Sequence, residues 1–87
     1  DLANLEAEML EELGVIERER DLDLDRRFKQ LEGDVVTLEK EGAKDSEINA
    51  QRRAAEKDLS GIRDRSAAEL ELVRRAYDEC KNLFARR

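Results

Sequence analysis

Residues 38–46 read Leu-Glu-Lys-Glu-Gly-Ala-Lys-Asp-Ser, and they divide the chain into two halves that each carry a long helical pattern. Gly42 stands where the first pattern ends, and helices often end with glycine because only glycine enters the left-handed conformation freely. Asp45 or Ser46 can cap a second helix by accepting hydrogen bonds from its free backbone amides, and Glu47 suits the positive end of its dipole. The stretch therefore predicts a turn at 42–45 between helices at 2–41 and 46–84.

Seam positions recur at helical spacing on both sides of this turn, as on one face of each helix. The first stripe comprises Leu2, Leu5, Met9, Leu13, Ile16, Arg20, Leu24, Phe28, Leu31, Val35 and Leu38. The second stripe comprises Ile48, Arg52, Ala55, Leu59, Ile62, Ser66, Leu70, Val73, Tyr77, Cys80 and Phe84. Each stripe contains two consecutive steps of four residues, a stutter that locally unwinds a coiled coil.

The stutters lie at matching heights once the chain is folded back at 42–46. The first stripe has stutters around Met9 and Arg20 and the second has one at Ser66, and the fold-back sets Arg20 beside Ser66. The same fold-back brings together the pairs Leu24 and Ile62, Phe28 and Leu59, Leu13 and Val73, and Met9 and Tyr77. Two unrelated segments have no reason to agree in this way. The pattern predicts an all-α fold, an antiparallel two-helix coiled-coil hairpin with matched stutters, as a single domain over 1–87.

Composition favours the same architecture. Charged residues make up 46% of the chain and aromatic residues 3%, which with helical periodicity is typical of coiled coils. Residues 1–43 hold 14 acidic and 6 basic residues, a net charge of −8, whereas residues 44–87 hold 9 acidic and 11 basic residues, a net charge of +2. This asymmetry favours pairing of the two halves with each other over pairing of two acidic helices.

The chain has no apolar run long enough to span a membrane and no signal peptide, so we expect a soluble, cytoplasmic protein. It begins at Asp1 without an initiator Met, which suggests a piece excised from a longer polypeptide. Cys80 is the single cysteine and lies on the apolar stripe, where a free thiol behaves as a small hydrophobic group.

Arg20 is the charged residue at the first stripe's stutter, and it has two interpretations. In one, its stem packs in the seam while the guanidinium reaches out to Glu17, Asp64 or Glu69. In the other, Arg20 opposite the small Ser66 sets the register, because a one-turn slip would misplace a polar seam residue.

A run of acidic residues at alternate positions resembles part of an EF-hand loop. Asp21, Asp23, Asp25 and Glu32 occupy its positions one, three, five and twelve. However, Arg26 stands where glycine is needed, and Leu24, Phe28 and Leu31 keep the helical pattern, which favours a solvated helix face. The chain has no His, no phosphate loop and no cysteine pair, so we expect no catalytic residue, cofactor or metal within it.

Basic residues gather in the second half, where they are candidates for weak contact with nucleic acid. Acidic residues are interspersed, the pI is about 4.8, and no aromatic residues are interleaved for base stacking, so a mixed solvated face is the simpler interpretation. The residues concerned are Arg52, Arg53, Lys57, Arg63, Arg65, Arg74, Arg75, Lys81, Arg86 and Arg87.

Three blocks of sequence carry a family resemblance: residues 5–9 (LEAEM), residues 38–44 (LEKEGAK) and residues 62–65 (IRDR) followed by Glu69-Leu70. They resemble the lineage-specific insertion in the N-terminal part of the actinobacterial RNA polymerase β′ subunit, with Gly42, Ala43 and Lys44 at the hairpin tip. Tyr77 falls where that family carries a bulky aromatic residue. The sequence departs from the pattern at Gly14, at residues 21–25 and at residues 46–51.

This resemblance implies a non-catalytic hairpin that projects from the clamp of a DNA-directed RNA polymerase. Its partners would be the rest of the polymerase, with weak contact to DNA or a transcription factor. The parent subunit's catalytic aspartate motif and zinc-binding cysteines are absent here. Two alternatives remain open: a structural coiled-coil fragment that self-associates as a dimer, supported by off-stripe apolar residues, and an acidic adaptor for a basic partner. The off-stripe residues are Leu10, Val15, Leu22, Val36 and Leu72.

Overall fold

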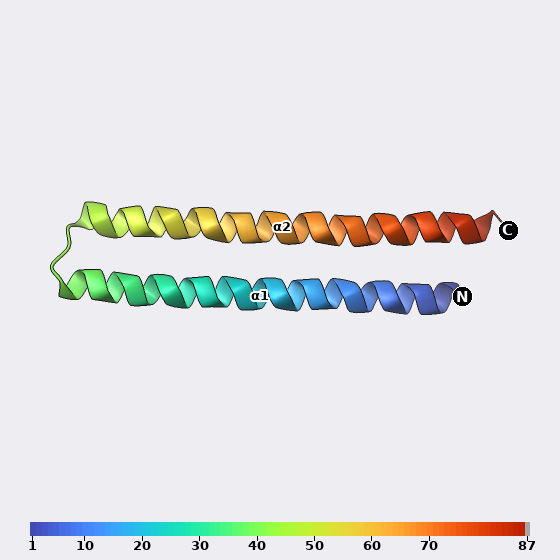
Figure 1. Cartoon of the computed structure of the whole chain (residues 1–87), viewed down its shortest axis with the longest axis horizontal. Coiled ribbons are helices and arrows are strands. Elements are labelled where there is room, and N and C mark those ends of the chain that lie inside the picture. Colours follow the sequence, from blue (N-terminus) through green and yellow to red (C-terminus); the bar gives the residue numbers. More distant parts are fainter. Residues whose placement is uncertain (87) are drawn as a thin grey trace.

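The computed structural model describes residues 1–86 and confirms an all-α hairpin within them. Helix α1 runs from Leu2 to Lys40 and helix α2 from Asp45 to Ala85. The two helices lie side by side in opposite directions, so that both ends of the chain lie at the same end of the rod (Figure 1). The Cα trace measures 69 × 17 × 8 Å. The fold is thus a single layer of two helices, and its core is the seam between them.

The turn between the helices depends on Gly42. Glu41 is the C-cap of α1, and Gly42 follows it with φ +74°, in the left-handed region. The Ala43 amide donates to the Leu38 carbonyl at 2.9 Å, and the Gly42 amide donates to the Glu39 carbonyl at 3.2 Å. These two bonds form a Schellman motif, which satisfies carbonyls that the end of α1 would otherwise leave free.

The two helices begin differently. Asp1 caps α1, since its side chain accepts from the Asn4 amide at 2.9 Å. The N-cap of α2 is Lys44, which makes no capping bond with its side chain. The expectation that Asp45 or Ser46 caps this helix is wrong, because the Schellman motif closes the turn by Ala43 and α2 already begins at Asp45. Asp45 still lies in the first turn of α2, where its negative charge suits the helix dipole.

The seam of α1 contains Arg27 where the sequence predicts Phe28. Phe28 is 46% exposed, whereas the Arg27 side chain is only 15% exposed. The seam then follows an 11-residue period in which Leu5, Ile16, Arg27 and Leu38 share one position. Such a period, 3.67 residues per turn, does not impose the left-handed winding of heptads, and the helices run alongside each other without crossing (Figure 1).

Burial is concentrated on α2, which contributes five of the six buried residues within 1–86. Leu13 is the buried residue of α1, and the buried residues of α2 are Ile48, Ala55, Leu59, Ser66 and Leu70. Most of the remaining seam residues of α1 are half-buried, because two helices can cover each other on one side only.

Several stripe residues near the ends of the helices are exposed instead of packed. On α2 these are Arg52, Cys80 and Phe84, and on α1 the stripe residue Leu2 is 42% exposed. The five off-stripe apolar residues named above are exposed as well, with Leu72 at 64% and Leu10 at 58%. None of the helices within residues 1–86 is both long and apolar enough to cross a membrane.

Candidate functional site

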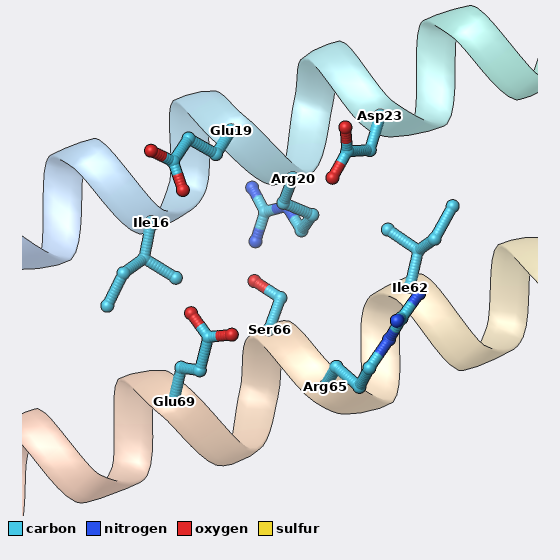
Figure 2. A pocket seen from close by; sticks show the side chains of 8 residues that line it. All are labelled: Ile16, Glu19, Arg20, Asp23, Ile62, Arg65, Ser66 and Glu69. Carbon is cyan, nitrogen blue, oxygen red and sulfur yellow. The ribbon is translucent and has the colours of Figure 1, made fainter.

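Arg20 and Ser66 face each other across the middle of the seam, at the predicted stutters (Figure 2). The two residues lie in a shallow cleft between α1 and α2. Figure 2 shows the carboxylates of Glu19 and Glu69, from opposite helices, on the same side of this pair. The full lining of the cleft is Ile16, Glu19, Arg20, Asp23, Ile62, Arg65, Ser66 and Glu69.

Ser66 is a buried polar residue without a partner. Its side chain is 6% exposed, and its hydroxyl Oγ makes no hydrogen bond to any residue in 1–86. A buried hydroxyl without a partner destabilises the folded state, because it loses its bonds to water without replacing them. The small side chain nevertheless fits a position opposite the long Arg20.

The Arg20 guanidinium pairs with a neighbour on its own helix. Its Nε donates to Asp21 Oδ1 at 3.1 Å, and the side chain remains 30% exposed. The expected partners Glu17, Asp64 and Glu69 are therefore not the ones it contacts. The prediction missed Asp21 because adjacent residues on a helix do not normally face each other. Whether Arg20 sets the register stays a prediction.

Arg27 makes the ion pair that joins the two helices, and the sequence reasoning missed it. Its Nε donates to Asp58 Oδ2 at 2.9 Å, while its Nη1 is buried with no partner in the described part of the chain. The 11-residue spacing from Ile16 to Arg27 was the signal that could have placed Arg27 in the seam. A stripe limited to apolar residues selects the neighbouring Phe28 instead.

The three tip residues lie together at the far end of the rod from the termini. Gly42 makes the turn, Ala43 is half-buried, and Lys44 is exposed. The exposed Lys44 side chain and the free amides at the start of α2 make the tip a feature that a partner can contact. A contact at the tip stays a prediction.

Residues 21–32 are continuous helix and do not form a calcium-binding loop. Three of the acidic side chains are instead paired with neighbours on the same helix, Asp21 with Arg20 at 3.1 Å, Asp23 with Arg26 at 3.8 Å and Asp25 with Lys29 at 2.9 Å. The hydrogen bond and charge of Asp25 raise the pKa of Lys29 above its ordinary value. Residues 1–86 contain no group of three or more His, Cys, Asp or Glu side chains arranged to hold a metal ion.

The basic residues of α2 do not form one uninterrupted patch. Arg75 pairs with Glu71 at 3.1 Å, and Arg65 donates to the Gly61 carbonyl at 3.3 Å, so both are engaged within the helix. Arg52 lines a hollow beside the tip with Glu39 and Asp45. Arg87 lies outside the described residues. Nucleic-acid contact by this helix stays a prediction.

Comparison with known proteins gives relatives of one kind. The chain is 42% identical over 83 residues to DNA-directed RNA polymerase subunit beta' of Beutenbergia cavernae, 43% to that of Micrococcus luteus and 40% to that of Streptomyces coelicolor. Each alignment covers 95% of this chain but only 6% of the relative, so the chain spans a small part of the length of these subunits. No protein-family model matches, and the comparison with solved structures gives no match.

Proposed function

This chain is a homologue of one segment of the actinobacterial RNA polymerase β′ subunit, and from that relationship we propose that it serves transcription as a non-catalytic helical insertion in such a subunit. The proposal rests on sequence identity to these subunits of about two residues in five over 95% of the chain. The rest of the polymerase is then its partner, and the bacterial cytoplasm is where it works.

The shape of the hairpin supports an insertion. Both ends of the chain lie at one end of the rod (Figure 1), so a host can accept the hairpin within a surface loop without separating the flanking residues. A rod of 69 Å would carry the tip residues far from the point of attachment. We propose that it projects from the clamp and adjusts the position of the clamp or receives DNA or a transcription factor.

The chemistry of the chain supports a role without catalysis. The sequence has no His, and its one cysteine, Cys80, is exposed. Every Asp and Glu in residues 1–86 except the half-buried Asp34 is exposed, and solvated carboxylates are not the desolvated, tuned groups of acid–base catalysis. We therefore assign the hairpin a mechanical or binding role.

The test replaces the matching segment of the Micrococcus luteus β′ subunit with a short Gly-Ser linker and compares the two polymerases. We expect nucleotide addition to persist, and the lifetime of promoter complexes, pausing or the response to a factor to change. Loss of nucleotide addition in a fully assembled enzyme would contradict the non-catalytic role. An enzyme unchanged in every transcriptional property would contradict a regulatory one.

A second candidate function is self-association, which the exposed apolar residues favour. Leu72 and Leu83 lie eleven residues apart and so occupy the same face of α2, at 64% and 62% exposure. Sedimentation of the chain over a wide range of concentrations tests this candidate. A monomer at every concentration would exclude it, whereas a dimer that loses helicity on dilution would support a structural coiled coil in place of the insertion.

A further inference from the structure

The first part of α1 is unusually acidic and contains no positive side chain. Residues 1–17 hold six acidic residues, and the first basic residue of the chain is Arg18. The part of α2 that lies alongside this region carries both acidic and basic residues, so the excess of negative charge is on α1. A surface of this kind attracts cations and repels the phosphates of nucleic acid.

Part of this negative charge lines a hollow with an apolar floor. Its lining consists of three glutamates, Glu8, Glu11 and Glu12, with Val15 and Ile16 further along the same helix. Val15 is 40% exposed and Ile16 is half-buried, so hydrocarbon is accessible beside the carboxylates. Lysine and arginine combine an apolar stem with a charged end, and this hollow offers both kinds of contact. In residues 1–86 none of the three carboxylates has an ion-pair partner.

Neighbouring hollows continue from this one along the same face. Glu8 and Glu12 also line a hollow that reaches Tyr77 and Cys80 of α2, towards the ends of the chain. In the other direction Ile16 is shared with the cleft of Arg20 and Ser66. With a further hollow lined by Glu19, Leu22, Asp23 and Arg26, the hollows extend from about residue 5 to residue 26 of α1, which at 1.5 Å per residue is roughly 30 Å. We name this surface the acidic track, defined by Glu8, Glu11, Glu12, Glu19, Asp23 and Glu69.

Ser66 adds an independent sign that the track accepts a ligand. Ser66 is 6% exposed, its hydroxyl has no hydrogen-bond partner within residues 1–86, and it points across the cleft towards Arg20 (Figure 2). It can accept a hydrogen bond from a cationic donor that reaches the cleft, where the carboxylates of Glu19 and Glu69 have no ion-pair partner within residues 1–86. Arg20 and Arg65 also line the cleft; Arg20 Nε donates to Asp21 Oδ1 and Arg65 Nε to the Gly61 carbonyl.

We propose that the acidic track binds a lysine- and arginine-rich segment of a partner protein. Charge complementarity identifies the occupant as basic, and the apolar floor at Val15 favours side chains with hydrocarbon stems. A length of about 30 Å fits a peptide segment of several residues better than it fits a single small cation. The inference deepens the proposed function by naming the chemistry of the partner. It rests on that function only in placing the partner within the transcription machinery.

The test titrates the 87-residue chain with a 20-residue Lys-Ala peptide and follows the backbone amide signals by NMR at low salt. We expect the shifts to cluster at residues 5–26 and 62–80. The variant with Glu8, Glu11 and Glu12 all replaced by Gln should lose affinity by ~10-fold or more. A matched variant with Glu32, Glu41 and Glu56 replaced by Gln changes the net charge equally at exposed sites away from the track, and it should lose less than ~3-fold.

Equal losses in the two variants would show attraction by net charge alone and would overturn the proposal. Spermidine that displaced the peptide at equal positive charge would also overturn it, because the track would then recognise a polyamine and no protein segment. Circular dichroism checks that both variants remain helical, and the shift map of the unmodified chain tests the location without any substitution. Peptide binding does not depend on the deletion experiment, so either proposal can fail without the other.

Discussion

Arg27 Nε lies 2.9 Å from Asp58 Oδ2, and this ion pair links α1 to α2 across the seam. The other four ion pairs identified in residues 1–86 each join two residues of the same helix. Among the ion pairs of residues 1–86, the Arg27–Asp58 pair is therefore the one that ties a position on α1 to a position on α2. An uncharged seam residue such as Ser66 makes no ion pair between the helices.

Removing the carboxylate of this pair should lower the free energy of unfolding more than replacing the arginine with an apolar residue. Asp58→Ala leaves a guanidinium that is only 15% exposed without its acceptor, and we expect the free energy of unfolding to fall by about 1–2 kcal/mol. Arg27→Leu instead places an apolar side chain in the seam, and we expect a change between zero and a gain of about 1 kcal/mol. Urea unfolding followed by circular dichroism measures both. A loss in Arg27→Leu as large as that in Asp58→Ala would contradict the argument.

Ser66→Ala should stabilise the hairpin. The substitution removes a buried hydroxyl that has no hydrogen-bond partner in residues 1–86 and also improves helix propensity, so we expect a gain of about 1–2 kcal/mol in the free energy of unfolding. Ser60→Ala is the matched control, because Ser60 is exposed on the same helix and its replacement gives the propensity gain alone. Equal gains from the two substitutions would mean that the Ser66 hydroxyl costs nothing.

Gly42 and Gly33 should respond in opposite directions to alanine. At Gly42 the backbone has φ +74°, which a Cβ disfavours, so Gly42→Ala should lower the free energy of unfolding by about 1 kcal/mol. Gly33 lies within α1 and a Cβ there meets nothing within 4 Å, so Gly33→Ala should raise it by about 0.5–1 kcal/mol. The melting temperature of each variant, compared with that of the unmodified chain, tests both expectations. A destabilised Gly33→Ala variant would show that the helix needs glycine there for a contact.

The architecture followed from the sequence because helical periodicity and a glycine at the turn are local signals. Two stripes of matching spacing require an antiparallel pair, and Gly42 needs nothing beyond its own backbone to make the turn. The meeting of Arg20 with Ser66 followed from the same count of residues.

The details that sequence reasoning missed depend on contacts between helices or on single-residue steps. Choosing Phe28 over Arg27 is a shift of one position, and hydrophobicity favours the wrong residue when a charged stem fills the seam. The cap of α2 was misplaced because the length of the turn depends on how the Schellman bonds close. The acidic track required knowing which glutamates border a shared hollow.

Lys29 gives the chain a contribution to stability that depends on pH. The hydrogen bond and the charge of Asp25 raise the pKa of Lys29, so the folded state favours the ammonium form. This contribution is fully present below the pKa of lysine in the unfolded chain, about 10.4, and is lost as pH rises through the higher pKa of the folded state. Asp25→Asn should return the pKa of Lys29 towards its ordinary value.

An NMR titration of the lysine side-chain signals between neutral and strongly alkaline pH measures this change directly. We expect Asp25→Asn to lower the pKa of Lys29, because the variant loses both the hydrogen bond and the charge that raise it. An unchanged pKa of Lys29 in Asp25→Asn would mean that the 2.9 Å contact with Asp25 is not what raises it.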